Sequence, residues 1–243
     1  MTAESLTLFA HVCGRREAEP DLLEAALLVG EIEYERVDVA GARAAIDELG
    51  RGARRAVTGF TGGPRVERLL QYVYGELGFQ GNAAEYYDPR NSFLSDVIAR
   101  RTGIPISLAI VLVEIARRAD VDAAGVGFPG HFLVRSPVPG GALVIDPFEG
   151  RLLAVTELRT LYAKTTGDTG AVPPRLLEPA TTRQILLRML NNLRGIYASR
   201  DDTPRLCRAL ERMQVLAPTD DTRAEIERLG GRTAVATTPR VLN

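Results

Sequence analysis

The sequence is poor in the residues that most often carry metal or redox chemistry. Its 243 residues include no tryptophan, two cysteines and two histidines. Cys13 and Cys207 stand far apart, which excludes the disulfide framework that stabilises many small secreted domains. Two cysteines cannot form a four-cysteine zinc site, and His11 and His131 are too few for a histidine-rich one. We therefore expect no metal and no cofactor.

An excess of charge of either sign is also missing. The 30 Lys+Arg residues nearly balance the 31 Asp+Glu residues, so we expect no nucleic-acid partner. No apolar run is long enough to span a bilayer, and Met1–Phe9 carries Glu4 and no basic segment typical of a signal peptide. These absences predict a globular, cytoplasmic protein with reduced thiols and no membrane contact.

Apolar residues recur at helical spacing through much of the chain. The segment Leu108–Ala119 is apolar on almost every side, which predicts a buried helix with Ser107 at its N-cap. We expect the glycines of Gly50-Arg51-Gly52 to end a helix that begins at Val39, and a linker over Pro173–Pro179. The other predicted helices are Asp21–Val29, Val39–Leu49, Arg65–Leu77, Asn91–Arg101, Thr156–Thr165, Thr182–Ala198, Thr203–Leu216 and Thr222–Leu229, followed by a frayed tail from Thr233.

Between these helices lies a stretch with the composition of strands. Short segments rich in β-formers, separated by Gly and Pro, predict strands over Ala123–Phe128, His131–Arg135 and Ala142–Asp146. The turn over 136–141 makes the last two an antiparallel hairpin, and Leu152–Leu153 adds a short strand. Helices, then a small antiparallel sheet, then a helical hairpin indicate an α+β fold.

His131 and Asp146 are the first candidates for a functional pair. His131 follows Phe128-Pro129-Gly130 at the head of one predicted strand, and Asp146 ends the next, so the two lie roughly opposite one another. A carboxylate that orients a histidine is part of a catalytic triad. The alternatives are a histidine hydrogen-bonded to a carbonyl and an aspartate that caps the turn before Pro147.

Ser107 is the candidate for the third member. It stands at the start of the buried helix, where the helix dipole assists a nucleophile, whereas both cysteines lie elsewhere in the sequence. A serine acts as a nucleophile only if its oxygen lies within about 3 Å of the histidine that takes its proton. The alternative is a helix cap, and the two roles do not exclude one another.

Four stretches, in this order, resemble the bacterial SirB family, whose core is transglutaminase-like. They are residues 88–97 (DPRNSFLSDV), 101–108 (RTGIPISL), 125–135 (GVGFPGHFLVR) and 145–150 (IDPFEG). Residues 185–193 (ILLRMLNNL) are similar to the tetratricopeptide-like tail common in that family. The resemblance covers about residues 5 to 230.

The resemblance implies a papain-like arrangement, with a cysteine at the start of a buried helix, a histidine on one strand and an aspartate on the next. His131 and Asp146 match the histidine and the aspartate. The cysteine position falls at Ser107 or at Pro105, so the thiol is missing. We expect a transglutaminase-like core over residues 1–172, followed by a linker and a tetratricopeptide-like tail over residues 173–243.

Two functions are compatible with this sequence. Loss of the thiol favours a pseudoenzyme that acts as a protein-interaction or regulatory module with a protein partner. The alternative is a serine-dependent amide or ester hydrolase, or an acyltransferase, that uses Ser107, His131 and Asp146.

Overall fold

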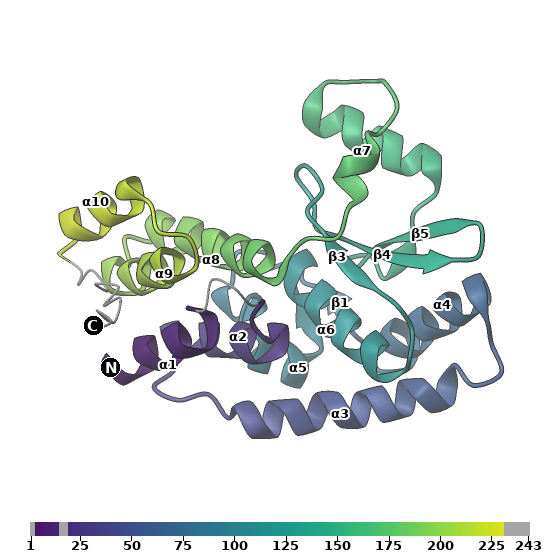
Figure 1. Ribbon diagram of the computed structural model, residues 1–243, viewed down its shortest axis with the longest axis horizontal. Coiled ribbons are helices and arrows are strands. Elements are labelled where there is room, and N and C mark those ends of the chain that lie inside the picture. The colour runs from purple at the N-terminus through teal and green to yellow at the C-terminus, as the bar shows by residue number, and fades with distance from the viewer. Residues whose placement is uncertain (1–2, 15–18, 231–243) are drawn as a thin grey trace, which may run out of the picture.

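The computed structural model describes residues 3–14 and 19–230 of the chain (Figure 1). Its α-helices are α1 (Ala3–Cys13), α2 (Leu22–Leu28), α3 (Val39–Ala56), α4 (Gly62–Leu70), α5 (Leu94–Arg100), α6 (Pro105–Arg118), α7 (Val155–Thr166), α8 (Thr182–Ser199), α9 (Thr203–Leu216) and α10 (Asp220–Arg228). Shorter turns of helix are the 3₁₀ segments η1 (Val29–Ile32), η3 (Pro89–Asn91) and η4 (Pro174–Leu177) and the π-helix η2 (Gln71–Glu76). Among these described residues, no helix is long and apolar enough to cross a membrane.

Polar side chains start several of these helices. The carboxylates of Asp21, Asp38 and Asp202 each accept a hydrogen bond from a backbone N–H in the first turn that follows. The Thr181 hydroxyl accepts in the same way from the Gln184 N–H at the start of α8, and the Gln184 side-chain oxygen accepts a hydrogen bond from the Thr181 N–H. Because the first N–H groups of a helix lack partners inside it, such caps fix where the helix begins.

Helix α3 continues through the glycines that were predicted to end it. The helix runs on to Ala56. Its glycines do not form a turn; they allow neighbouring segments to pack closely against the helix. A Cβ on Gly50 would lie 2.3 Å from the Cβ of Arg118 on α6. A Cβ on Gly52 would meet the hydroxyl of Tyr72 in η2. The two glycines therefore let α3 pack closely on its neighbours, which outweighs their low helix propensity.

The main sheet is antiparallel, with the strand order β3-β4-β5-β6. Its strands are β3 (Ala124–Val126), β4 (Leu133–Val138), β5 (Gly141–Asp146) and β6 (Arg151–Leu152). The hairpin between β4 and β5 is tighter than predicted, because pairing continues from Val134–Ile145 as far as Val138–Gly141. Gly140 makes this short turn possible with a positive φ of 86°. A separate parallel pair joins β1 (Gln80–Gly81) to β2 (Thr102–Gly103).

The two faces of the main sheet pack against different helices. Val134 and Ile145 belong to the large core that α6 fills, whereas their neighbours Leu133 and Val144 pack in a smaller cluster with α7. This alternation follows from the two-residue period of a strand. In Figure 1, α7 accordingly lies on one side of the sheet, and α4 and α6 lie on the other. The predicted α+β fold, with a buried helix on a small antiparallel sheet, is confirmed.

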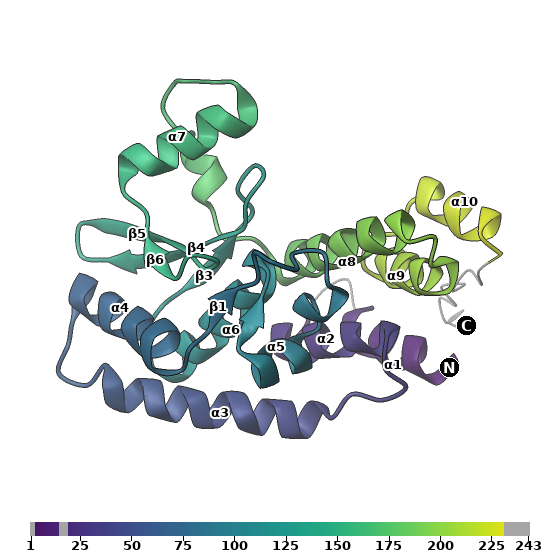
Figure 2. The ribbon, with the colours of Figure 1, turned by 180° about the vertical axis from the view of Figure 1, so that it is seen from behind.

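Helices α8 and α9 form a hairpin that packs on α2 and α6, and α10 follows it (Figure 2). Leu186, Met189 and Leu190 of α8 are fully buried and join the same apolar core as α6. The linker predicted over Pro173–Pro179 contains the 3₁₀ turn η4. The division of the chain at residue 172 stays a prediction, and the tail predicted to fray from Thr233 lies outside the described residues.

The N-terminal segment forms helix α1, which is not among the helices predicted by range from the sequence. Helix α1 packs against α9, near the other end of the described chain. The guanidinium of Arg212 on α9 is 2% exposed, donates a hydrogen bond to Ser5 Oγ at 2.7 Å and lies over the ring of Phe9. Burial lowers the pKa of Arg212 to about 10.

Candidate functional site

Ser107 lies in the first turn of α6 and is fully buried. Pro105 begins the helix, as its fixed φ and missing N–H favour, so Ile104 and not Ser107 is the N-cap residue. The Ser107 Oγ accepts a hydrogen bond from the Ile104 N–H at 3.1 Å. As a donor, the hydroxyl lies within hydrogen-bond distance of two carbonyl oxygens, with the Oγ 2.6 Å from that of Asn91 and 3.1 Å from that of Ile104. The hydroxyl is therefore fully engaged with backbone atoms.

Asn91 extends this buried cluster towards the surface. Its side-chain amide donates hydrogen bonds to the carbonyls of Glu85 and Tyr86 at 2.7 and 3.3 Å. Its amide oxygen accepts a hydrogen bond from the Asn82 side chain at 3.1 Å. Asn91 is fully buried, so each of these hydrogen bonds satisfies a polar group that water does not reach. Together Ser107 and Asn91 hold residues 82–88, which we call the tyrosine loop, against the start of α6.

His131 is placed by a turn before β4 and not by the strand itself. Its backbone N–H donates to the Phe128 carbonyl at 3.1 Å, and Gly130 takes a positive φ of 69° between them. Strand β4 begins only at Leu133. Continuing the register from Val134 and Ile145 places Leu133, and not His131, opposite Asp146. The predicted strand position of His131 is therefore wrong by two residues.

Asp146 ends β5 and caps the turn that follows. Its Oδ1 accepts hydrogen bonds from the backbone N–H groups of Phe148 at 2.9 Å and Glu149 at 3.1 Å. This is the turn-capping alternative that the sequence left open. Burial, reinforced by the nearby charge of Asp146, raises the pKa of the Tyr74 phenol.

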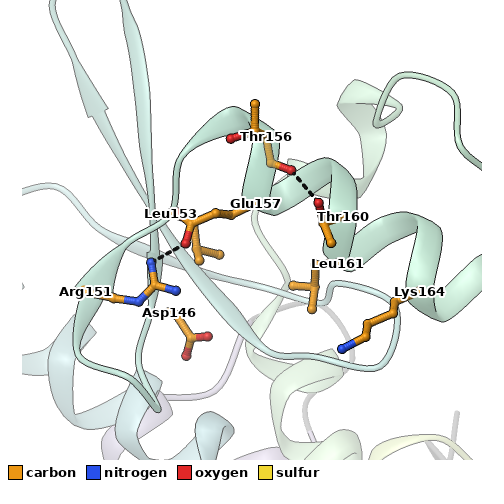
Figure 3. Close-up of a pocket in the computed structure, with 8 residues that line it drawn as sticks. All are labelled: Asp146, Arg151, Leu153, Thr156, Glu157, Thr160, Leu161 and Lys164. Atoms are coloured by element: carbon orange, nitrogen blue, oxygen red, sulfur yellow. Dashed lines mark hydrogen bonds and ion pairs between the residues drawn. The ribbon is translucent and has the colours of Figure 1, made fainter.

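Asp146 also lines a shallow hollow between the sheet and α7, with a volume of about 350 Å³ (Figure 3). Arg151 and Glu157 form an ion pair at 2.8 Å on one side of it. Lys164 reaches towards the hollow from α7, and it makes no ion pair with any other residue that the structure describes. Asp146 thus lies on the α7 side of the sheet, whereas α6, which carries Ser107, packs against the opposite face.

The three candidate residues are not assembled into a triad in this structure. Within residues 3–14 and 19–230, no hydrogen bond joins any two of Ser107, His131 and Asp146. Over the same ranges, no group of three histidine, cysteine or acidic side chains is placed to hold a metal ion.

Both cysteines lie outside helix α6. Cys13 ends α1 and Cys207 lies in α9, and both are buried free thiols. Burial raises the pKa of Cys13 to about 12 and also raises that of Cys207, so both thiols stay protonated at neutral pH.

Comparison with known proteins places this arrangement in a family. The sequence model of the transglutaminase-like superfamily matches residues 40–191, which include Ser107, His131 and Asp146. The chain belongs to the transglutaminase-like superfamily. It also belongs to the UPF0162 family: a UPF0162 protein of Xylella fastidiosa is 40% identical over 204 residues, covering 81% of this chain and 72% of the relative.

This transglutaminase-like chain aligns with most of one further relative and with a small part of another. A UPF0162 protein of Pseudomonas aeruginosa is 32% identical over 200 residues, covering 82% of this chain and 73% of the relative. F-box only protein 21 of Homo sapiens is 33% identical over 134 residues, which are 51% of this chain but 20% of that protein.

The most exposed aromatic residue that the structure of this transglutaminase-like protein describes, Tyr87, lies on the tyrosine loop. Tyr87 is 71% exposed and Tyr86 is 41% exposed, and their rings meet edge to face at 5.3 Å. Arg200 at the end of α8 donates a hydrogen bond to the Tyr87 carbonyl at 3.1 Å. The loop is thus held at both ends, by Asn91 on the core side and by Arg200 on the α8 side.

A hollow of about 520 Å³ lies between the tyrosine loop and α8. It is lined by Tyr86, Tyr87, Ile104, Asn191, Asn192, Gly195, Ile196 and Ser199. Sequence reasoning did not single out these residues as functional. The adjacent tyrosines, and the paired asparagines in the middle of a predicted helix, were the available signal, because polar amides in helix interiors have low propensity.

Proposed function

We propose that this transglutaminase-like protein, of the SirB type, binds another protein and does not use an enzymatic nucleophile. The observation that carries the proposal is the environment of Ser107, whose hydroxyl is fully buried and hydrogen-bonded to backbone atoms. A serine nucleophile needs a histidine within hydrogen-bond reach and an open approach for the substrate. Ser107 has neither in this arrangement.

Protein binding is supported by the tyrosine loop. Exposed tyrosines are enriched at protein interfaces, because they bury a large apolar surface at low entropic cost and keep a polar hydroxyl. Tyr86 and Tyr87 meet this description beside a hollow of about 520 Å³. Helix α8, which we propose to form a tetratricopeptide-like tail with α9, borders the same hollow. We propose that this protein binds its partner in the cytoplasm.

A serine-directed fluorophosphonate probe tests the absence of a nucleophile. We expect no labelling of the full chain at neutral pH, because the Ser107 oxygen is inaccessible. A matched pair of wild type and Ser107→Ala controls for adventitious reaction elsewhere. Labelling that disappears in Ser107→Ala would show the serine-dependent hydrolase and overturn the proposal.

Site-specific photocross-linking tests the binding surface. A benzophenone amino acid replaces Tyr87 in one variant and Val155, which is 69% exposed on α7, in the control. We expect a discrete cross-linked protein in native cells with the first variant only. That protein, once purified, should bind the wild-type chain and lose at least tenfold in affinity for Tyr87→Ala. Equal cross-linking at both positions, or binding unaffected by Tyr87→Ala, would contradict the proposed surface.

A further inference from the structure

The hollow beside the tyrosine loop continues along α8. A second hollow, of about 590 Å³, shares Asn191 and Asn192 with the first, so the two meet at these residues. The second is lined by Leu187, Arg188, Asn191, Asn192, Met213, Ala217, Thr219 and Thr222. One groove therefore follows α8 between the tyrosine loop and the residues at the end of α9 and the start of α10.

The groove has the length of a short extended peptide. Arg188, Asn192, Gly195 and Ser199 recur at spacings of three and four, which places them along one face of α8. The 11 steps from Arg188 to Ser199 rise by about 17 Å in an α-helix, which is the span of about five residues in an extended strand.

Arg188 is the only charged residue among those that line the two hollows. Its guanidinium is partly buried, lies over the ring of Phe132, and donates to the carbonyl oxygens of Phe128 at 3.3 Å and His131 at 2.7 Å. Burial lowers its pKa, though an arginine stays charged at neutral pH. In the described part of the chain, no carboxylate lies within ion-pair distance of it. This cation is compensated by two carbonyl dipoles and an aromatic ring, without a counter-charge, and a carboxylate is the group that best completes its surroundings.

The middle of the groove offers hydrogen bonds without charge. The side-chain amides of Asn191 and Asn192 make no hydrogen bond to any residue that the structure describes. An amide side chain presents both donors and an acceptor, which matches the N–H and C=O groups of an extended backbone. Beyond them, Gly195 adds no side chain, and a Cβ placed there would meet nothing within 4 Å.

We propose that this groove binds an extended segment of about five residues from a partner protein, with an internal Asp or Glu side chain paired to Arg188. The amides of Asn191 and Asn192 hydrogen-bond its backbone, and an apolar side chain packs against Tyr87. The inference rests on the proposed function and adds the chemistry of the partner to it.

Matched peptide libraries test this directly on the full chain. One library has the form acetyl-X₃-Asp-X₃-amide, the second replaces the central Asp with Asn, and the third carries Asn and a free C-terminal carboxylate. We expect enrichment from the Asp library alone, and the enriched peptide is then measured by fluorescence anisotropy. Equal enrichment from the Asp and Asn libraries, or preference for the free carboxylate, would contradict the proposal that an internal acidic residue pairs with Arg188.

Two variants locate the site of the bound peptide. Arg188→Gln should weaken binding at least tenfold, whereas Arg159→Gln, a charge change on the exposed face of α7, should leave it unchanged. Gly195→Gln fills the groove at a position with open space and should also abolish binding without disturbing the fold. Circular dichroism confirms that each variant is folded. Binding that survives both Arg188→Gln and Gly195→Gln would sink the proposal.

Two outcomes separate this inference from the function on which it rests. If the protein cross-linked at Tyr87 binds Arg188→Gln as tightly as wild type, the acidic segment is wrong and protein binding stands. If the chain sediments as a dimer that Gly195→Gln dissociates, the groove is a contact between two copies, and a segment of another protein is excluded. Labelling of Ser107 by fluorophosphonate bears on the proposed function alone.

Discussion

The surroundings of Ser107 and those of His131 differ, although both residues lie in the range that matches the transglutaminase-like superfamily. Ser107 is fully buried, and its hydroxyl is bonded to the backbone of two segments. The His131 side chain makes no hydrogen bond to any described residue, and its backbone carbonyl accepts a hydrogen bond from the Arg188 guanidinium. Around Ser107, every polar group of the hydroxyl has a partner in the backbone. His131 instead lies beside the groove along α8. Two candidate residues within one matched domain therefore differ in whether backbone atoms already occupy their side chains.

The largest loss is expected at Asn91, because it supports both the Ser107 cluster and the tyrosine loop. Asn91→Ala removes three side-chain hydrogen bonds from a buried site and should lower the free energy of unfolding by about 3 kcal/mol. Urea unfolding followed by circular dichroism measures this. Asn82→Ala, which removes one of the three and an exposed hydrogen bond from the Glu85 N–H, is the control and should cost about 1 kcal/mol. Equal losses would show that Asn91 does not organise the cluster.

Ser107→Ala should have a smaller effect of the same kind. It removes the partner of the Ile104 N–H and of the Asn91 carbonyl, and the expected loss is about 1.5 kcal/mol in urea unfolding. The two polar side chains share one cluster, so the losses for Ser107→Ala and Asn91→Ala should not be additive. An unchanged midpoint for Ser107→Ala would contradict a structural role.

The Cys13 thiol extends the comparison to another buried side chain. Its pKa is raised by burial from 9.0 to about 12, so the folded state holds a proton that the unfolded chain releases between these values. Its contribution to stability is complete below pH 9 and is lost as the pH rises towards 12, by at most about 1.4 kcal/mol per pH unit.

Urea unfolding between pH 8 and pH 10.5 measures this slope in wild type and in Cys13→Ala. The variant should lose less stability over the interval, and Cys207→Ala serves as the control for a second buried thiol. Identical pH dependence in wild type and Cys13→Ala would show that the thiol is accessible.

The smallest effect is expected at His131. Because its side chain makes no hydrogen bond to a described residue, His131→Ala should change the free energy of unfolding by no more than about 0.5 kcal/mol. Unfolding in urea at pH 7.5 checks this beside Ser107→Ala. A loss larger than that of Ser107→Ala would reverse the comparison drawn above.

Local patterns were enough to predict most helices and the order of the sheet. The segment Thr203–Leu216 matches α9 at both ends, because Asp202 caps it and Ala217-Pro218 ends its apolar period. Two results depend on distant contacts and could not be read from the sequence. The continuation of α3 past Gly52 requires the neighbouring α6 and η2, and the helix over Ala3–Cys13 packs against α9.

The candidate site was predictable as a set of residues but not as a geometry. Its spacing was consistent with a His131–Asp146 pair, yet a turn at Gly130 moves His131 out of the strand. The two-residue alternation then puts Asp146 on the face covered by α7. Which face a strand end presents depends on register, and a shift of one residue reverses it.

The contact between α1 and α9 bears on how the chain is made. Ser5 and Arg212 are 207 residues apart, so the N-terminal helix leaves the ribosome long before its partner is synthesised. During this time the apolar face of α1 around Phe9, which is buried in the folded protein, is exposed to solvent. Aggregation competes with folding while such a surface is exposed. This exposure lasts until α9 has emerged and can pack against α1.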